Sequence, residues 1–140
     1  MSEKYKILSN FVKDMSSETP DVESYLSTKN NINKYELDID ISSKPLKNKL
    51  IEVNTSLKFQ NKTQADKKSY FEIVYASIVK IDESVKEKKD LQKIILCDIQ
   101  NDIYPKLEKI LLNLLNDSGY SNVKFDKKVD FNKLFNDKFN

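Results

Sequence analysis

The stretch that decides the fold runs from Tyr35 to Ser42 and reads YELDIDIS. Apolar and polar side chains alternate through the whole of it, so an extended strand here would have one apolar side and one hydrated side. The alternation resumes after Pro45, from Ile51 to Phe59. The two stretches predict neighbouring antiparallel strands joined by a turn at Pro45.

Two further stretches are apolar at both parities, Tyr5 to Met15 and Tyr70 to Ile81. We predict that they form the first and last strands, and that each is covered on both faces or contacts a partner subunit. The segment between the first strand and Tyr35 contains Tyr25 and Leu26 and has no obvious structure. It predicts a long connecting loop of the kind that is often functional.

In the second half of the chain the apolar period changes to that of a helix. Leu91, Ile94 and Ile95 share one helical face, which predicts a helix that ends near Asp98 or Ile99.

A longer, separate helix is predicted to follow, with Asp102 as its N-cap, Pro105 in its first turn and Gly119 just beyond its end. Its apolar positions are Ile103, Leu107, Ile110, Leu111, Leu114 and Leu115. They are wider than a single stripe, so we expect this helix to be covered on more than one side.

A last short helix is predicted to start at the N-cap Asp130, with Val129 and Leu134 in contact as a hydrophobic staple. The summed pattern is α+β: a single domain over residues 1–140, with a four-stranded antiparallel sheet followed by helices packed on it. Apolar residues left over on the first strand, the last strand and the long helix indicate a homo-oligomer.

Composition excludes several classes of function. The 24 basic residues are interspersed with 22 acidic ones, so the net charge is only +2 and no basic face for nucleic acid is expected. The chain has no histidine, and Gly119 is its one glycine, which argues against a metal cluster, a histidine base and a phosphate-binding loop. We therefore expect no cofactor, no metal and no enzymatic activity.

The remaining candidates for chemistry have ordinary interpretations. Cys97 is the one cysteine and lies between Leu96 and Ile99, so we interpret it as a buried structural thiol that suits a reducing cytoplasm. Asp38 and Asp40 could act as an acid and a base, but a hydrated strand face is the favoured interpretation. No apolar run is long enough for a signal peptide or a membrane span, which predicts a cytoplasmic protein without membrane insertion.

The surface best suited to binding is apolar. A groove between sheet and helix would be lined by Tyr25, Leu26, Tyr35, Leu37, Ile39, Leu107, Leu111 and Leu114. For the strand and helix members, burial in the core or in a subunit interface is the favoured interpretation, because periodic apolar stripes usually bury themselves. Tyr25 and Leu26 lie in a polar segment and fit a flexible contact better.

Three stretches, in this order along the chain, resemble motifs of the SecB family of export chaperones. The first is FVKDMSSETPD from Phe11 to Asp21, and the second is FEIVYASI from Phe71 to Ile78. The third combines NDIYP, which ends at Pro105, with VDFNKLF, which ends at Phe135. Each motif is weak alone, but the resemblance covers nearly the whole chain.

The resemblance implies a homotetramer, built as a dimer of dimers with helices between two sheets. It also implies an ATP-independent holdase that binds unfolded preproteins in apolar grooves and delivers them to the SecA translocation motor. The groove-lining strand face of the family falls on Tyr35, Leu37 and Ile39, and its mobile crossover loop falls around Tyr25 and Leu26.

The family surface that faces SecA falls on Asp14, Glu18, Tyr70 and Glu72. By strand parity, Asp14 shares a side with Leu8 and Val12, and Tyr70 shares a side with Glu72. The chain departs from the family pattern at Ser17, Tyr70, Ser77 and Gln100. Its charge is near neutral, whereas familiar members are strongly acidic.

Two alternatives stay open. A SecB-like chaperone could serve a single partner, such as a toxin–antitoxin component, and neighbouring genes would distinguish this case. A small-ligand-binding or scaffold protein could use the same groove, and such a protein would fail to suppress the aggregation of unrelated unfolded proteins.

Overall fold

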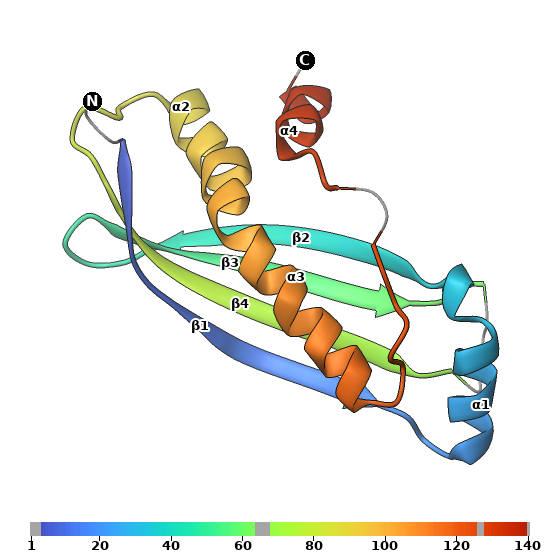
Figure 1. The fold of residues 1–140 in the computed structure, drawn as a ribbon. Coiled ribbons are helices and arrows are strands. Elements are labelled where there is room, and N and C mark those ends of the chain that lie inside the picture. Colours follow the sequence, from blue (N-terminus) through green and yellow to red (C-terminus); the bar gives the residue numbers. More distant parts are fainter. Residues whose placement is uncertain (1–3, 64–67, 126–127, 140) are drawn as a thin grey trace.

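The computed structural model describes residues 4–63, 68–125 and 128–139. Its four strands form one antiparallel sheet, as the sequence predicted, and their order in the sheet is β1-β4-β3-β2 (Figure 1). They are β1 (Tyr5–Glu18), β2 (Glu36–Pro45), β3 (Leu50–Gln60) and β4 (Tyr70–Ile81). The predicted pairing of the two alternating stretches is confirmed, with Leu37 opposite Phe59 and Ile39 opposite Leu57.

The helices cover one face of this sheet, which we call the helix side; the other is the outer face (Figure 1). The apolar core lies on the helix side, where α3 (Ile99–Asp117) buries a residue at every fourth position. These residues are Ile99, Ile103, Leu107, Leu111 and Leu115. No helix in the described part of the chain is long and apolar enough to cross a membrane.

The predicted break between two helices is wrong. The short helix α2 (Lys88–Lys93), the π-helical turn η2 (Ile94–Asp98) and α3 form one continuous helix, with Pro105 inside it. Asp102 is not an N-cap, because it lies inside α3, and its carboxylate accepts a hydrogen bond from the Tyr5 hydroxyl of β1. Pro105 removes the hydrogen bond that its amide would have donated toward Asn101, a residue that is exposed to solvent.

The π-helical turn has an anchor that was not predicted from the sequence. The Gln100 side chain is fully buried. Its amide nitrogen donates to the carbonyl oxygen of Ile95 at 3.1 Å, and its amide oxygen accepts from the Thr55 hydroxyl of β3 at 3.0 Å. The widened turn is thereby tied to the sheet through a satisfied pair of buried polar groups.

The predicted end of α3 is confirmed. Gly119 has φ +102°, a conformation that favours glycine. The Tyr120 amide donates to the Leu115 carbonyl at 2.8 Å and the Gly119 amide donates to the Asn116 carbonyl at 3.1 Å, which is the Schellman pattern.

The last helix is α4 (Phe131–Phe139). Asp130 is its N-cap, as predicted, because the carboxylate accepts from the Lys133 amide at 3.0 Å. The predicted staple contact does not bury Leu134, whose side chain is 53% exposed. Phe131 and Phe135 are the buried side chains that anchor α4 to the core.

The predicted loop around Tyr25 and Leu26 is instead a helix, α1 (Val22–Asn30), followed by a single 3-10 turn, η1 (Ile32–Lys34). Asp21 caps α1 by accepting from the Ser24 amide at 2.7 Å. The buried residues of α1 are polar, Ser24 and Thr28, while Val22 and Leu26 are exposed. No apolar stripe therefore marked this helix in the sequence.

Candidate functional site

A buried polar network attaches α1 to the sheet. The Thr28 hydroxyl accepts from the Ser69 amide at 2.9 Å, and the Tyr35 hydroxyl donates to the Ser69 carbonyl at 2.6 Å. The Ser69 hydroxyl lies 3.1 Å from that of Tyr120 and 2.8 Å from that of Thr19. Burial, the largest influence, raises the pKa of Tyr35, so its hydroxyl stays protonated at neutral pH.

Tyr25 joins α1 to the segment that follows α3. Its hydroxyl donates to the Gly119 carbonyl at 3.1 Å, and its ring centroid lies 5.3 Å from that of Tyr120. A β-carbon on Gly119 would lie 2.6 Å from the Tyr25 ring. The one glycine of the chain thus permits the close approach of these two segments.

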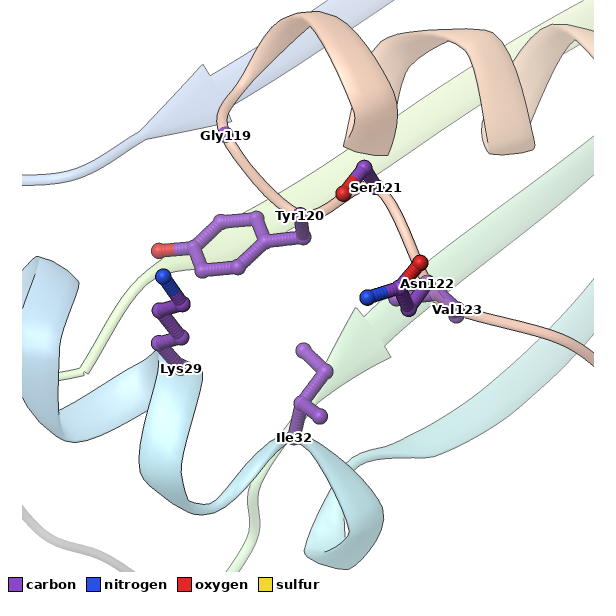
Figure 2. Close-up of a pocket in the computed structure, with 7 residues that line it drawn as sticks. All are labelled: Lys29, Ile32, Gly119, Tyr120, Ser121, Asn122 and Val123. Carbon is purple, nitrogen blue, oxygen red and sulfur yellow. The ribbon is translucent and has the colours of Figure 1, made fainter.

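A cavity of about 250 Å³, here called the α1 pocket, opens beside this joint (Figure 2). Its lining residues are Lys29, Ile32, Gly119, Tyr120, Ser121, Asn122 and Val123. Figure 2 shows the side chains of Lys29 and Ile32 projecting from α1 and η1 toward Tyr120 and Asn122. The pocket combines apolar walls with polar groups at its border.

A second cavity of about 230 Å³, the β2 pocket, lies between β2 and α4. Its lining residues are Ile39, Asp40, Ile41, Leu96, Phe131, Leu134 and Phe135. Six of these seven residues are apolar, and β2 is an edge strand of the sheet. The α1 pocket lies near the start of β2, and the β2 pocket lies near its middle.

The structure divides the predicted groove residues into two groups. Tyr35, Leu107 and Leu111 are buried in the core, so they support the helix side rather than line an open surface. Tyr25, Leu37, Ile39 and Leu114 are half-buried, and Leu26 is 52% exposed. The lining residues Lys29, Ile32 and Asn122 were not predicted, because they belong to segments without an apolar period.

A third cavity, of about 420 Å³, lies against α3. Its lining residues are Asn101, Tyr104, Pro105, Glu108, Lys128, Val129 and Phe131. Burial, followed by the charge of Glu108 and its hydrogen bond, raises the pKa of Tyr104 to about 12. The Tyr104 phenol is therefore neutral at physiological pH and donates to the carboxylate.

On the outer face, the four residues assigned to SecA by resemblance lie together. Glu18 is opposite Tyr70 in the β1–β4 pairing, and Asp14 lies opposite Val74. The Tyr70 hydroxyl donates to a Glu72 carboxylate oxygen at 2.6 Å. Burial raises the pKa of Tyr70 well above its ordinary value, and the carboxylates of Glu72, Glu18 and Asp14 add to this effect.

The parity predicted for Asp14 is wrong, although its placement on the outer face is as expected. A register shift between Val12 and Asp14, at Lys13, makes a bulge in β1. Val12 lies opposite Tyr75 on the helix side, whereas Asp14 lies on the outer face. The bulge places Asp14 on the same face as Glu18, Tyr70 and Glu72.

The strand β1 also leaves apolar side chains in solvent, although it is an edge of the sheet. Leu8, Phe11, Val12 and Met15 are each between 41% and 52% exposed. Monomeric proteins usually protect such an edge with charges or bulges, and an apolar edge is a site for pairing with another chain.

The remaining candidates behave as ordinary structural groups. Asp38 forms an ion pair with Lys62 at 2.9 Å at the surface. Cys97 is fully buried beside Asn132, and burial raises the pKa of its thiol, which makes it less reactive. Within residues 4–63, 68–125 and 128–139, no group of three His, Cys, Asp or Glu residues could hold a metal ion.

Comparisons with known proteins agree on one family. The family model described as preprotein translocase subunit SecB matches residues 1–140. A Pelagibacter ubique protein assigned by name to the protein-export proteins SecB is 56% identical over the full length of both chains. The protein-export protein SecB of Bradyrhizobium diazoefficiens is 24% identical over 92% of this chain and 78% of its own.

A solved structure has the same fold. It is the SecB-like chaperone of Mycobacterium tuberculosis in complex with a ChAD peptide from an antitoxin, with a TM-score of 0.64 over 89% of this chain and 91% of that one. The two sequences are 9% identical, so the likeness concerns the fold alone.

Proposed function

This chain belongs to the SecB family and has its chaperone role in preprotein export, and we propose that it acts as an ATP-independent holdase. A holdase needs no catalytic group, because it binds exposed apolar segments in extended form and adds up weak contacts over several pockets. The observation that carries the proposal is the family match over residues 1–140, to which the apolar pockets beside β2 add physical support.

In this proposal the client lies along β2 on the helix side. It would contact Leu26, Leu37 and Ile39 and place side chains in the α1 pocket and the β2 pocket. From Tyr35 to Ile41 the strand advances roughly 20 Å at about 3.4 Å per residue, so an extended segment of similar length would reach both pockets.

We propose a homotetramer, a dimer of dimers, as the working form. The exposed apolar side chains of β1 support this, because pairing of two β1 edges would remove them from water.

We propose that Asp14, Glu18, Tyr70 and Glu72 form the surface that meets SecA when the client is delivered. The cluster supports this because it combines acidic groups with a half-buried aromatic ring on the outer face. The proposed client site is on the opposite face of the sheet, so the two partners would not compete for the same surface.

The alternative is a chaperone dedicated to one partner. The SecB-like chaperone of Mycobacterium tuberculosis, which is similar in fold, is in complex with a peptide from an antitoxin. The relatives that are similar in sequence are export proteins by name, and this favours the export role here. Binding of unrelated unfolded proteins would separate the two.

The test is aggregation of a chemically unfolded secretory precursor, without nucleotide, together with the mass of the protein in solution. We expect suppression by a species with the mass of four protomers. Leu37→Asp should weaken suppression and leave that mass unchanged, because Leu37 is half-buried on the helix side.

Ser42→Asp is the matched control, since Ser42 is exposed on the outer face of the same strand and gains the same charge. Suppression equal to that of the unaltered chain in Leu37→Asp would overturn the proposed client site. No suppression by the unaltered chain would overturn the holdase function itself.

A further inference from the structure

The lining of the α1 pocket includes a positively charged side chain, that of Lys29. Lys29 is the one charged residue among the seven described residues that line it, so its described lining includes no acidic group. Ile32, Tyr120 and Val123 supply apolar surface, and the side chains of Ser121 and Asn122 add groups that donate hydrogen bonds.

Lys29 is available for a ligand. It is exposed in the last turn of α1, and no ion pair joins it to another residue within the described ranges. Figure 2 shows its side chain on the same side of the cavity as Ile32, facing the segment that follows α3. A carboxylate at the mouth of the pocket could therefore meet Lys29 while an apolar group contacts Ile32.

The size of the pocket indicates what it holds. Its volume of about 250 Å³ is below the range of about 300–1,000 Å³ that is typical of sites for drug-sized ligands. It fits one large side chain of a longer segment better than a separate small molecule. A client in extended form would supply such a side chain.

We propose that the α1 pocket selects client segments in which an apolar residue is followed or preceded, two positions away, by Asp or Glu. The inference rests on the proposed function and adds a sequence preference to it. In an extended chain, residues two positions apart point to the same side and are about 6.6 Å apart. The apolar side chain enters between Ile32 and Tyr120, and the carboxylate pairs with Lys29.

The expected preference for acidic segments is small, because Lys29 is exposed to solvent. Ion pairs between exposed groups are weak, so an acidic segment should bind about two- to fivefold more tightly than its neutral counterpart. The preference should fade between about 0.15 M and about 1 M salt, because the screening length falls from about 8 Å to about 3 Å. Apolar contacts do not fade in this way.

The experiment measures the affinity of labelled peptides by fluorescence anisotropy. Three peptides share one apolar residue and differ two positions away, where they carry Glu, Gln or Lys. We expect the order Glu, Gln, Lys for the unaltered chain and the reverse order for Lys29→Glu. Lys34→Glu is the control, since Lys34 is exposed in η1, does not line the pocket, and brings the same change in charge.

Equal affinities of the three peptides for the unaltered chain would overturn the inference. It is also overturned if Lys34→Glu reverses the order as Lys29→Glu does, because the effect would then be one of net charge. Aggregation assays on the same samples separate the peptide preference from the holdase function. A chain that suppresses aggregation without the peptide preference keeps the holdase function and loses only the role of Lys29.

Discussion

The joint between α1 and the end of α3 depends on the absence of a side chain at Gly119, and Gly119→Ala tests this. The residue has φ +102°, which alanine rarely adopts. The added β-carbon would lie 2.6 Å from the Tyr25 ring, closer than carbon atoms that are not bonded to each other normally approach. Tyr25 would have to leave its position against Tyr120.

The expected loss follows from three contributions. Holding alanine in this backbone conformation costs about 1–3 kcal/mol. Displacing Tyr25 breaks its 3.1 Å hydrogen bond to the Gly119 carbonyl, a loss of about 0.5–1.5 kcal/mol, and its 5.3 Å ring contact with Tyr120, a loss of similar size. Because Tyr25 is half-buried, the lower half of the ranges for its two contacts applies. Together with the backbone cost, we expect the free energy of unfolding to fall by about 2–5 kcal/mol.

The assay is urea unfolding of the unaltered chain, Gly119→Ala, Tyr25→Ala and the double variant, at one protomer concentration because assembly contributes to stability. The two substitutions remove the same contacts, so their effects should not add. We expect the double variant to lose at least about 1 kcal/mol less than the sum of the single losses. Effects that add within about 0.5 kcal/mol would refute the contact between Tyr25 and Gly119 as the cause.

Two further predictions concern buried polar groups. The pKa of Tyr104 is raised from its ordinary value of 10.0 to about 12, so folding favours the neutral phenol. This contribution to stability is at most about 2.7 kcal/mol for two pH units. It is present below pH 10 and is lost as the pH rises toward 12. Tyr104→Phe should show a smaller loss over this range in urea unfolding, and parallel losses in both proteins would contradict the assignment. Gln100→Leu should lower the free energy of unfolding by about 2–4 kcal/mol, because it leaves the Thr55 hydroxyl and the Ile95 carbonyl unpaired. Thr55→Val should cost less in the Gln100→Leu background than alone, and equal costs would show that the hydrogen bond does not stabilise the fold.

The sheet could be predicted because its signal is local. Strict alternation from Tyr35 to Ser42 and from Ile51 to Phe59 fixes which side of each strand is buried, and the register confirms it. The two-sided apolar pattern of Tyr70–Ile81 predicted the strand β4, but the helices of this chain cover only its helix side, and Val74 and Ile78 on the outer face are half-buried. These features depend only on the order of side chains along one segment.

The joint around α1 could not be predicted in the same way. The helix is held by Ser24 and Thr28, and short polar side chains have no period that distinguishes a helix from a loop. Their hydrogen-bond partners, such as Ser69, are distant in sequence. The α1 pocket could not be predicted for the same reason.

The bulge at Lys13 is the feature that gives β1 two different surfaces. Without it, Asp14 would keep the parity of Val12 and its carboxylate would lie on the helix side. With it, Asp14 lies beside Tyr70 and Glu18 on the outer face, while Met15 returns to the helix side opposite Ile73. β1 thus exposes Asp14 and Glu18 on the outer face, together with Phe11 opposite Ala76, and exposes Val12 and Met15 on the helix side. No parity count along the sequence could reveal a register that depends on pairing with β4.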